Sequence, residues 1–413
     1  MDKVDVLDTK AKTIVKTINL KVGNDTGNSE HDIVISDSSG NDIEQICQPS
    51  VISKVRKRPN LESIDEKYMI ENINDNLIVE VLSDEVTPGI FFIGNYALKS
   101  GERIKSIEIG LDNDKANNDV VFISTLAHIA GFAVKKAYKE GILDDEINVN
   151  VEMGCSLPIG QYNNKVAELF ESRFMEDKSI VKVVTPKKSI EVKLNFDFVH
   201  TIPEGVTASF ALSEMDDSIF KSYNDVNKEK LNKEYFKTHR VLHISIGEGT
   251  TEYPITKGIA YEPNYIKGSN NGLGIAIDNS LDEFIELKGM TNCSRQKFSE
   301  IIRDEKHRYY EDALEILEFH LEPQTDAIYN KAKTELERVN NEIDIIVVYG
   351  GGSILMKNGL ENRLKRLCKR AGIKLFYIDE KYAVTLESKG LYNLVNSALW
   401  QILKKDRLAS LKK

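Results

Sequence analysis

The sequence predicts an α/β fold made of two related halves, and three observations lead to this prediction. Strand-like and helix-like segments alternate along most of the chain, which is the pattern of α/β layers. A strand–glycine turn–strand unit occurs in each half, at residues 18–35 and 242–255. A third glycine cluster, residues 350–352, follows a buried-type strand and precedes a helix. The repeated hairpin suggests two related domains that face one ligand.

The first half of the chain shows a mixture of strand and helix patterns. Polar–apolar alternation predicts a hairpin over residues 13–36, and helical spacing of apolar residues predicts a helix over 119–140 that ends at Gly141. The polar, irregular residues 37–118 are interpreted as an inserted subdomain. The other expected elements are strands near 77–82, 90–93, 147–154, 180–184 and 190–198, and a helix at 161–176.

The second half begins with a charged helical stretch at residues 216–239 and a strand at 241–246. Helical patterns dominate residues 275–341, where Pro323 is expected to begin a helix because proline suits the first turn. Residues 343–349 have the continuous apolar pattern of a buried strand. The remaining expected elements are a helix at 353–371, a strand at 374–378 and a final helix at 388–404.

The composition fits a folded chain of two or three domains and argues against several classes of function. The 413 residues are 41% hydrophobic, which is enough to bury a sizeable core. A net charge of −10 does not favour coating nucleic acid or anionic membranes. No secretory leader and no apolar run of about 18 residues is visible. The four cysteines are far apart, so we expect a reducing cytoplasm rather than disulfides or a zinc site.

The two glycine turns have the composition of phosphate-binding bends. Glycine lets the backbone approach an anion closely and aim successive N–H groups at it, and hydroxyl side chains add donors. An ordinary hairpin turn would have a similar composition. The candidate nucleotide-binding residues in these turns are Gly27, Asn28, Ser29, Gly247, Glu248, Gly249, Thr250 and Thr251.

The third glycine cluster comprises Gly350, Gly351 and Gly352. The free N–H groups of a helix that begins behind glycines can accept a nucleoside or a phosphate. Glycine also permits close packing where a strand turns into a helix. The sequence is neither a Walker A motif nor GxGxxG, which argues against a P-loop and a Rossmann dinucleotide domain.

Two acidic residues complete the candidate site. Asp25 lies in the first turn, where a carboxylate could hold Mg²⁺ through its water shell. Glu204 follows Pro203 near the presumed domain border, where a carboxylate could orient or deprotonate a water that attacks a γ-phosphate. Either carboxylate could instead be a solvated turn residue. His31 and His243 flank the turns and are interpreted as strand residues rather than catalysts.

The order of these motifs resembles that of the actin-like ATPase superfamily. Residues 25–29, 202–205, 246–251 and 349–352 resemble its first phosphate loop, interdomain connection, second phosphate loop and adenosine loop. The stretch 156–162 resembles a segment of plasmid-partitioning bacterial actins, so the resemblance is closest to ParM-type plasmid-segregation actins of Gram-positive bacteria. It covers residues 16–403.

The resemblance implies two ribonuclease-H-like domains around a nucleotide cleft. Domain I would span residues 1–202 with the insertion at 37–118, domain II 203–384, and a C-terminal helix at 385–413 would return to domain I. Asp25 would organise Mg²⁺, Glu204 would position water, and the cofactor would be ATP or GTP. Residues 350–352 would pack beside the nucleoside.

The implied function is a cytoplasmic filament that segregates plasmid DNA. The partners would be further copies of the chain, stacked head to tail, and a plasmid-encoded DNA-binding adaptor on a centromere-like site. Direct DNA binding and membrane binding are not expected. The alternatives are a small-molecule kinase of the same superfold and a membrane-associated actin-like protein, the latter because residues 399–413 are basic and apolar.

One residue departs from the family pattern. The second phosphate loop usually begins with Asp, and here that residue is Ser245. A serine supplies no negative charge to Mg²⁺ or its waters, although Glu248 could partly compensate. We therefore expect slow hydrolysis of the nucleotide.

Overall fold

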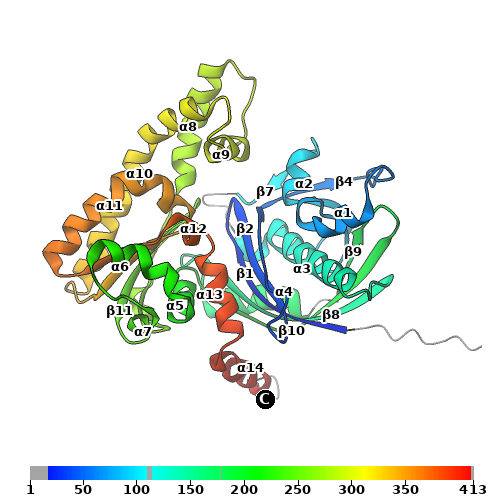
Figure 1. The fold of residues 1–413 in the computed structure, drawn as a ribbon, viewed down its shortest axis with the longest axis horizontal. Coiled ribbons are helices and arrows are strands. Elements are labelled where there is room, and N and C mark those ends of the chain that lie inside the picture. The colour runs from blue at the N-terminus through cyan, green and yellow to red at the C-terminus, as the bar shows by residue number, and fades with distance from the viewer. Residues whose placement is uncertain (1–16, 109–113, 177, 411–413) are drawn as a thin grey trace, which may run out of the picture.

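The computed structural model describes residues 17–108, 114–176 and 178–410, and these form two lobes (Figure 1). Each lobe contains one sheet with helices packed against it, so the chain has the mixed α/β architecture that the alternating pattern predicts. Residues 17–203 build the first sheet and residues 240–377 the second. The domain borders at residues 202 and 384 stay predictions.

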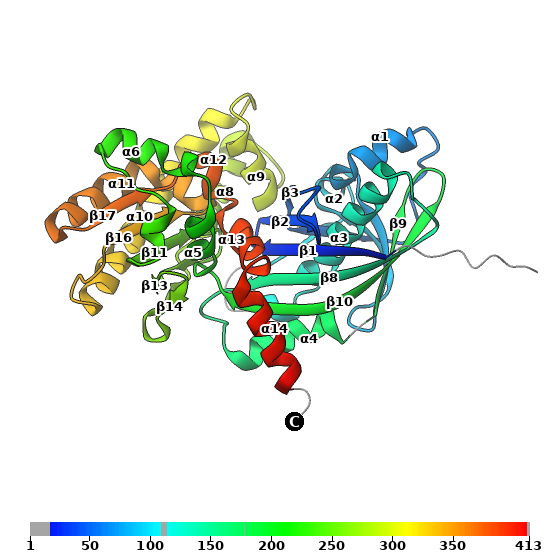
Figure 2. The same ribbon diagram turned by 60° about the horizontal axis from the view of Figure 1, so that its bottom comes forward.

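The first sheet has ten strands, and its long central strands run side by side (Figure 2). β1 pairs in parallel with β8, and β8 with β10, whereas β2 pairs antiparallel with β1, and β3 pairs antiparallel with β2. Residues 44–49, which the sequence analysis placed in the insertion, thus belong to the central meander. In spatial order the strands are β3 (Glu44–Pro49), β2 (Glu30–Asp37), β1 (Thr17–Thr26), β8 (Glu146–Leu157), β10 (Ser189–Pro203), β9 (Ser179–Val184), β5 (Ile78–Leu82), β6 (Gly89–Ile93), β4 (Val51–Val55) and β7 (Lys105–Ser106).

The main helix of the first lobe is α3 (Asp119–Lys139), which lies against the sheet. By length and composition it is the one helix of the described chain that could cross a membrane, but 94% of its apolar window is buried inside the lobe. It is therefore a core helix, more apolar than the sequence analysis expected. The other helices are α1 (Glu66–Glu71), η1 (Ile73–Asp75), α2 (Gly94–Lys99), η2 (Lys115–Asn117) and α4 (Asn164–Met175).

The second sheet is centred on β11 (Arg240–Ile246), which pairs in parallel with β16 (Ile345–Tyr349). Beyond β16 lies β17 (Lys374–Tyr377), also parallel. The smaller strands are antiparallel and are β12 (Thr251–Glu252), β13 (Ile255–Lys257), β14 (Ala260–Tyr261) and β15 (Gly268–Ser269).

One helix boundary expected in the second lobe, the start at Pro323, is wrong. Pro323 does not begin a helix but lies inside α10 (Tyr310–Arg338). The segment before it is helical because Ala313, Leu317 and Leu321 form a buried face, whose burial offsets the hydrogen bond that proline cannot make. The other helices are α5 (Thr207–Glu214), η3 (Asp217–Phe220), α6 (Lys221–Asn227), α7 (Lys233–Phe236), η4 (Pro263–Tyr265), α8 (Leu273–Lys288), α9 (Arg295–Arg303) and α11 (Gly351–Ala371).

The chain crosses between the lobes twice. It passes from β10 to α5 at residues 203–207, and it returns from α12 (Glu380–Ala383) to α13 (Leu386–Val395). The expected final helix is broken, because a second helix, α14 (Ala398–Ser410), follows α13 at a new angle (Figures 1 and 2). Trp400 of α14 is buried and donates to Glu152 Oε2 at 2.8 Å, which docks α14 on the first lobe.

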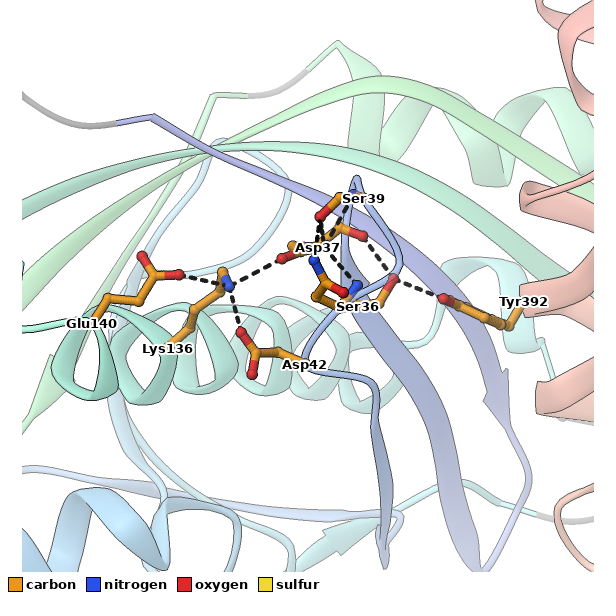
Figure 3. A network of polar contacts seen from close by, with 8 residues as sticks. Ser36, Asp37, Ser39, Asp42, Lys136, Glu140 and Tyr392 are labelled. Carbon is orange, nitrogen blue, oxygen red and sulfur yellow. Dashed lines mark hydrogen bonds and ion pairs between the residues drawn. The ribbon is translucent and has the colours of Figure 1, made fainter.

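A buried lysine joins the end of α3 to the end of β2 and to the turn that follows β2 (Figure 3). The Nζ of Lys136 on α3 lies 3.2 Å from Asp37, 2.7 Å from Asp42 and 2.8 Å from Glu140. These four residues are called the Lys136 network below. Asp37 also accepts hydrogen bonds from Ser39 and Asn41. The neighbouring Ser36 accepts a 2.8 Å bond from Tyr392, which connects α13 to the end of β2.

Candidate functional site

A cleft of about 690 Å³ lies between the two lobes, and both lobes line it. Thr251 is absent from its lining, because its Oγ1 donates to the Asn271 carbonyl at 2.8 Å and the side chain holds the loop before α8. Gly249 is also outside the lining, behind Asn28. The other eleven candidate residues line the cleft: Asp25, Gly27, Asn28, Ser29, Glu204, Gly247, Glu248, Thr250, Gly350, Gly351 and Gly352.

The two glycine turns have the same local geometry and touch each other. In the first, Gly27 N–H donates to the Glu30 carbonyl at 2.8 Å; in the second, Gly247 N–H donates to the Thr250 carbonyl at 2.9 Å. A Cβ on Gly249 would lie 3.0 Å from Asn28 Oδ1. Two bends from opposite lobes therefore meet at one end of a shared cleft, as two loops that hold one ligand must.

In the third glycine cluster, Gly350 and Gly352 are needed for close packing, whereas Gly351 is not. Gly350 has a φ of +89°, and a side chain there would clash with the Ile246 carbonyl, while a Cβ on Gly352 would lie 2.5 Å from Ile246 Cγ2. Both glycines are thus required where α11 packs on β11. Gly351 differs, because a Cβ there would meet no described atom within 4 Å. It leaves the cleft open at the N-terminus of α11.

The parallel strands of the first lobe bring Asp25 and Glu204 together. β1, β8 and β10 end at the same edge of the sheet, and there Ser156 Oγ donates to Asp25 Oδ1 at 3.2 Å. Burial, reinforced by the negative charge of Glu387, raises the pKa of Asp25 to about 7. Glu204 Oε1 accepts a 2.5 Å hydrogen bond from Lys115 Nζ.

Lys115 is a site residue that the sequence analysis missed. Its side chain is 4% exposed and lies next to Glu204. Burial acts to lower the pKa of Lys115, but the carboxylates of Glu204 and Asp25 outweigh that effect and raise it above its ordinary value. The lysine is therefore charged. It begins the short helix η2 just before α3, and no local sequence pattern marks it.

Two further carboxylates were also missed. Glu252 is 2% exposed and lines the cleft. The Thr250 side chain and the Ile159 N–H lie near its carboxylate, but neither oxygen makes a well-formed hydrogen bond within the described part of the chain. Burial and the charge of Glu204 raise its pKa well above the usual range. Glu387, in the first turn of α13, is buried as well, and burial and Glu204 raise its pKa. The residues Asp25, Glu204, Glu252 and Glu387, with Lys115, are called the cleft cluster below.

Ser245 contacts Glu387 and not the residue expected to compensate for it. Ser245 Oγ donates to Glu387 Oε1 at 2.5 Å. Glu248 instead has its carboxylate 3.7 Å from Arg295, at the start of α9. His31 and His243 are buried within their own lobes, where each bonds a polar strand side chain. Neither histidine lines the cleft.

The cleft fits a magnesium–nucleoside triphosphate. Two glycine bends supply backbone N–H groups for phosphates, and Gly351 leaves room at a helix N-terminus. The cleft cluster contains four carboxylates and one lysine, so a divalent cation would offset part of its negative charge. No three acidic, His or Cys side chains of the described residues are arranged to hold a metal ion directly. The carboxylates would therefore act on Mg²⁺ through its bound water, as Mg²⁺ often prefers.

Known proteins with this architecture are actin relatives. The model for the N-terminal domain of actin-like proteins matches residues 23–206. The crystal structure of the actin-like protein Alp7A superposes with a TM-score of 0.66 at 16% identity, covering 95% of this chain and 100% of that one. Bacillus thuringiensis ParM with ATP gives 0.58 at 16% identity, with 93% and 99% covered.

The archaeal actin homologue Ta0583 gives a TM-score of 0.59 at 17% identity, covering 91% of this chain and 99% of that one. No curated protein matches the chain significantly by sequence. At these identities the solved structures establish the fold. The chain therefore has the two-domain fold of the actin-like ATPase superfamily, and its residues 23–206 form an N-terminal domain of the actin-like protein type.

Proposed function

We propose that the protein is a nucleotide-dependent, polymerising actin that binds Mg²⁺ with ATP or GTP in the cleft. The contact between Asn28 and Gly249 carries the proposal, because it brings phosphate-type bends from opposite lobes to one site. A triphosphate bound there would touch both lobes and favour the closed arrangement. Closure would favour head-to-tail stacking of protomers, a contact that propagates rather than closes.

The residues of the cleft cluster would have separate tasks in hydrolysis. Glu204 would orient or deprotonate the water, and Asp25 would hold the hydrated Mg²⁺. Mg²⁺, when bound, would neutralise charge on the phosphates. Lys115 holds Glu204 Oε1 at 2.5 Å, so the carboxylate has one oxygen left for water. We propose slow hydrolysis, because this ion pair occupies one of the two carboxylate oxygens of Glu204.

The wider role that we propose is segregation of plasmid DNA by cytoplasmic filaments. A plasmid-encoded adaptor would bind the DNA, and the filament would bind the adaptor. Support comes from the ParM and Alp7A structures, which the chain resembles over nearly its full length. The docking of α14 through Trp400 favours a structural role for the basic C-terminal stretch rather than a membrane anchor.

Electron microscopy and light scattering with Mg²⁺ and ATP or GTP test the assembly. We expect filaments with one of these nucleotides and none without nucleotide. A rise in scattering without added sugar or acid substrates supports the filament, whereas ADP release that depends on such a substrate would support a kinase. Scattering that never rises with either nucleotide would contradict the proposal.

The role of Glu204 is tested separately by Glu204→Ala. The variant should still polymerise but form longer-lived filaments, because hydrolysis should fall by about 10²–10⁴-fold while phosphate contacts remain. The measurement is phosphate release per filament, beside filament lifetime by microscopy. A variant that never assembles with any nucleotide would show that the role assigned to Glu204 is wrong.

A further inference from the structure

The second crossing between the lobes delivers a carboxylate to the phosphate side of the cleft. α13 packs very closely on the first lobe and on α5, because side chains at Gly23 and Gly390 would clash with the backbones of Tyr392 and Thr207. Glu387, in the first turn of this helix, is thereby inserted between the lobes. It lines the cleft.

Three donors fix the Glu387 carboxylate, and they come from the first crossing and from the second sheet. Oε2 accepts hydrogen bonds from Gly205 N–H at 2.9 Å and Thr207 Oγ1 at 2.7 Å, both at the first crossing. Oε1 accepts from Ser245 Oγ at 2.5 Å, at the end of β11. All three donors are neutral, so they orient the carboxylate without balancing its charge.

The surroundings of Glu387 have too few positive groups. Lys115 is the one cation of the cleft cluster, and its Nζ bonds Glu204. Glu252, which also lines the cleft, is buried, and neither of its oxygens makes a well-formed hydrogen bond within the residues that the structure describes. Buried carboxylates without partners are costly. Two independent features therefore point to a cation from outside the chain: one carboxylate is oriented by neutral donors only, and another is buried without a well-formed hydrogen bond.

We propose that Glu387 organises the hydrated Mg²⁺ of the bound nucleotide and so supplies, from α13, the negative charge that Ser245 cannot. The inference rests on the proposed function, since it concerns the same cleft. Ser245 would then have a different task from a metal-organising residue. Its hydroxyl holds Glu387 Oε1 in place.

The test is the Mg²⁺ requirement of nucleotide binding in Glu387→Gln. Affinity for non-hydrolysable ATP and GTP analogues is measured over a range of free Mg²⁺, and bound Mn²⁺ is followed by electron paramagnetic resonance. The Mg²⁺ concentration for half-maximal binding should rise about tenfold or more, the effect of losing one favourable charge interaction. Glu380→Gln is the matched control, because Glu380 lines the cleft but is exposed, and it should change the requirement less than twofold.

A rescue variant distinguishes a role of Glu387 in organising the metal ion from a purely structural role. Ser245→Asp added to Glu387→Gln places a carboxylate beside the lost one and should restore the native Mg²⁺ requirement. The inference is overturned if Glu387→Gln weakens binding equally with and without Mg²⁺, or if Ser245→Asp does not rescue it.

Two further outcomes keep the inference testable. If Glu387→Gln does not fold, Ser245→Ala removes only the hydroxyl that holds Oε1 and should raise the Mg²⁺ requirement several-fold; an unchanged requirement overturns the inference. If the native chain binds neither nucleotide with Mg²⁺, the proposed function itself fails. If it binds and Glu387→Gln matches it, only the role of Glu387 fails.

Discussion

The molecule contains two buried lysines among carboxylates, and their surroundings differ in charge balance and in access to water. Lys136 contacts three carboxylates whose side chains are 18–42% exposed. Lys115 contacts Glu204 in a cluster of four carboxylates, of which Glu252 and Glu387 are buried and Asp25 is half-buried. The first network can be completed by water, whereas the second needs a cation.

The pKa values of the carboxylates show the same difference. Burial acts to raise the pKa of Asp37, but hydrogen bonds from Ser39, Asn41 and Lys136 outweigh it and lower the value to about 2. Burial raises the pKa of Asp25 to about 7, and no donor outweighs that effect. The Lys136 network therefore stabilises the fold, and the cleft cluster retains a preference for a ligand at the expense of stability.

The largest expected effect is that of Lys115→Met. Removing this lysine leaves Glu204 without its buried partner, so the unliganded protein should lose about 3 kcal/mol of unfolding free energy. Urea denaturation measures the loss, and Mg²⁺ with nucleotide should recover part of it, since both bind only the folded chain. Equal stability of the variant and the native chain would contradict the assignment of Lys115 as the cation of the cluster.

A smaller loss is expected from Lys136→Met. Water can solvate the partly exposed carboxylates that this variant leaves behind, so the loss should be about 1–2 kcal/mol. Nucleotide affinity should not change, because the Lys136 network does not line the cleft. If Lys136→Met weakened nucleotide binding as strongly as Lys115→Met does, the two regions would not be functionally distinct.

Replacing a carboxyl group by an amide should change the unfolding free energy in opposite directions in the two regions. Glu252→Gln removes a buried group that lies near the charge of Glu204 and should stabilise the unliganded protein by about 1 kcal/mol at pH 8. Asp42→Asn removes a partner of Lys136 and should destabilise it by about 0.5 kcal/mol, since Asp42 is 42% exposed. Thermal unfolding of both variants checks the signs. A loss of stability in Glu252→Gln would mean that this carboxyl group is well bonded.

The smallest expected effect is a pH dependence from Asp37. Its pKa in the folded chain lies below the ordinary value of 3.8, so the stabilisation is fully present above about pH 5 and is lost as the pH falls towards 2. The difference in unfolding free energy between the native chain and Asp37→Asn should therefore shrink between about pH 5 and pH 3. A constant difference over this range would show that Asp37 contributes no charge interaction.

Local patterns in the sequence predicted the glycine bends, Asp25 and Glu204. Those residues end strands or lie in turns, and parallel strands bring the ends together at one edge. Thr251 was included because it continues the second turn, but alternation along β12 puts its hydroxyl on Asn271.

Lys115 and Glu387 escaped prediction for a physical reason. Long-range packing, and not a motif in its own segment, brings Lys115 to Glu204 and Glu387 into the cleft. Glu387 depends on glycines at positions 23 and 390, which let α13 approach β1 and α5. Glu252 gave a weak signal, because it directly follows the second glycine turn. Pro323 was placed wrongly because a helical face on both sides of a proline outweighed the local rule.

The most direct test of the account is calorimetric titration of the native chain, Gly351→Leu and Gly160→Leu with Mg²⁺-ATP and Mg²⁺-GTP. Both glycines have free space where a side chain would begin, but only Gly351 lines the cleft. We predict one site per native chain for at least one nucleotide, unchanged binding in Gly160→Leu, and a loss of about 100-fold or more in Gly351→Leu. Binding of either nucleotide that is equally strong in all three proteins would place the site elsewhere and contradict the account.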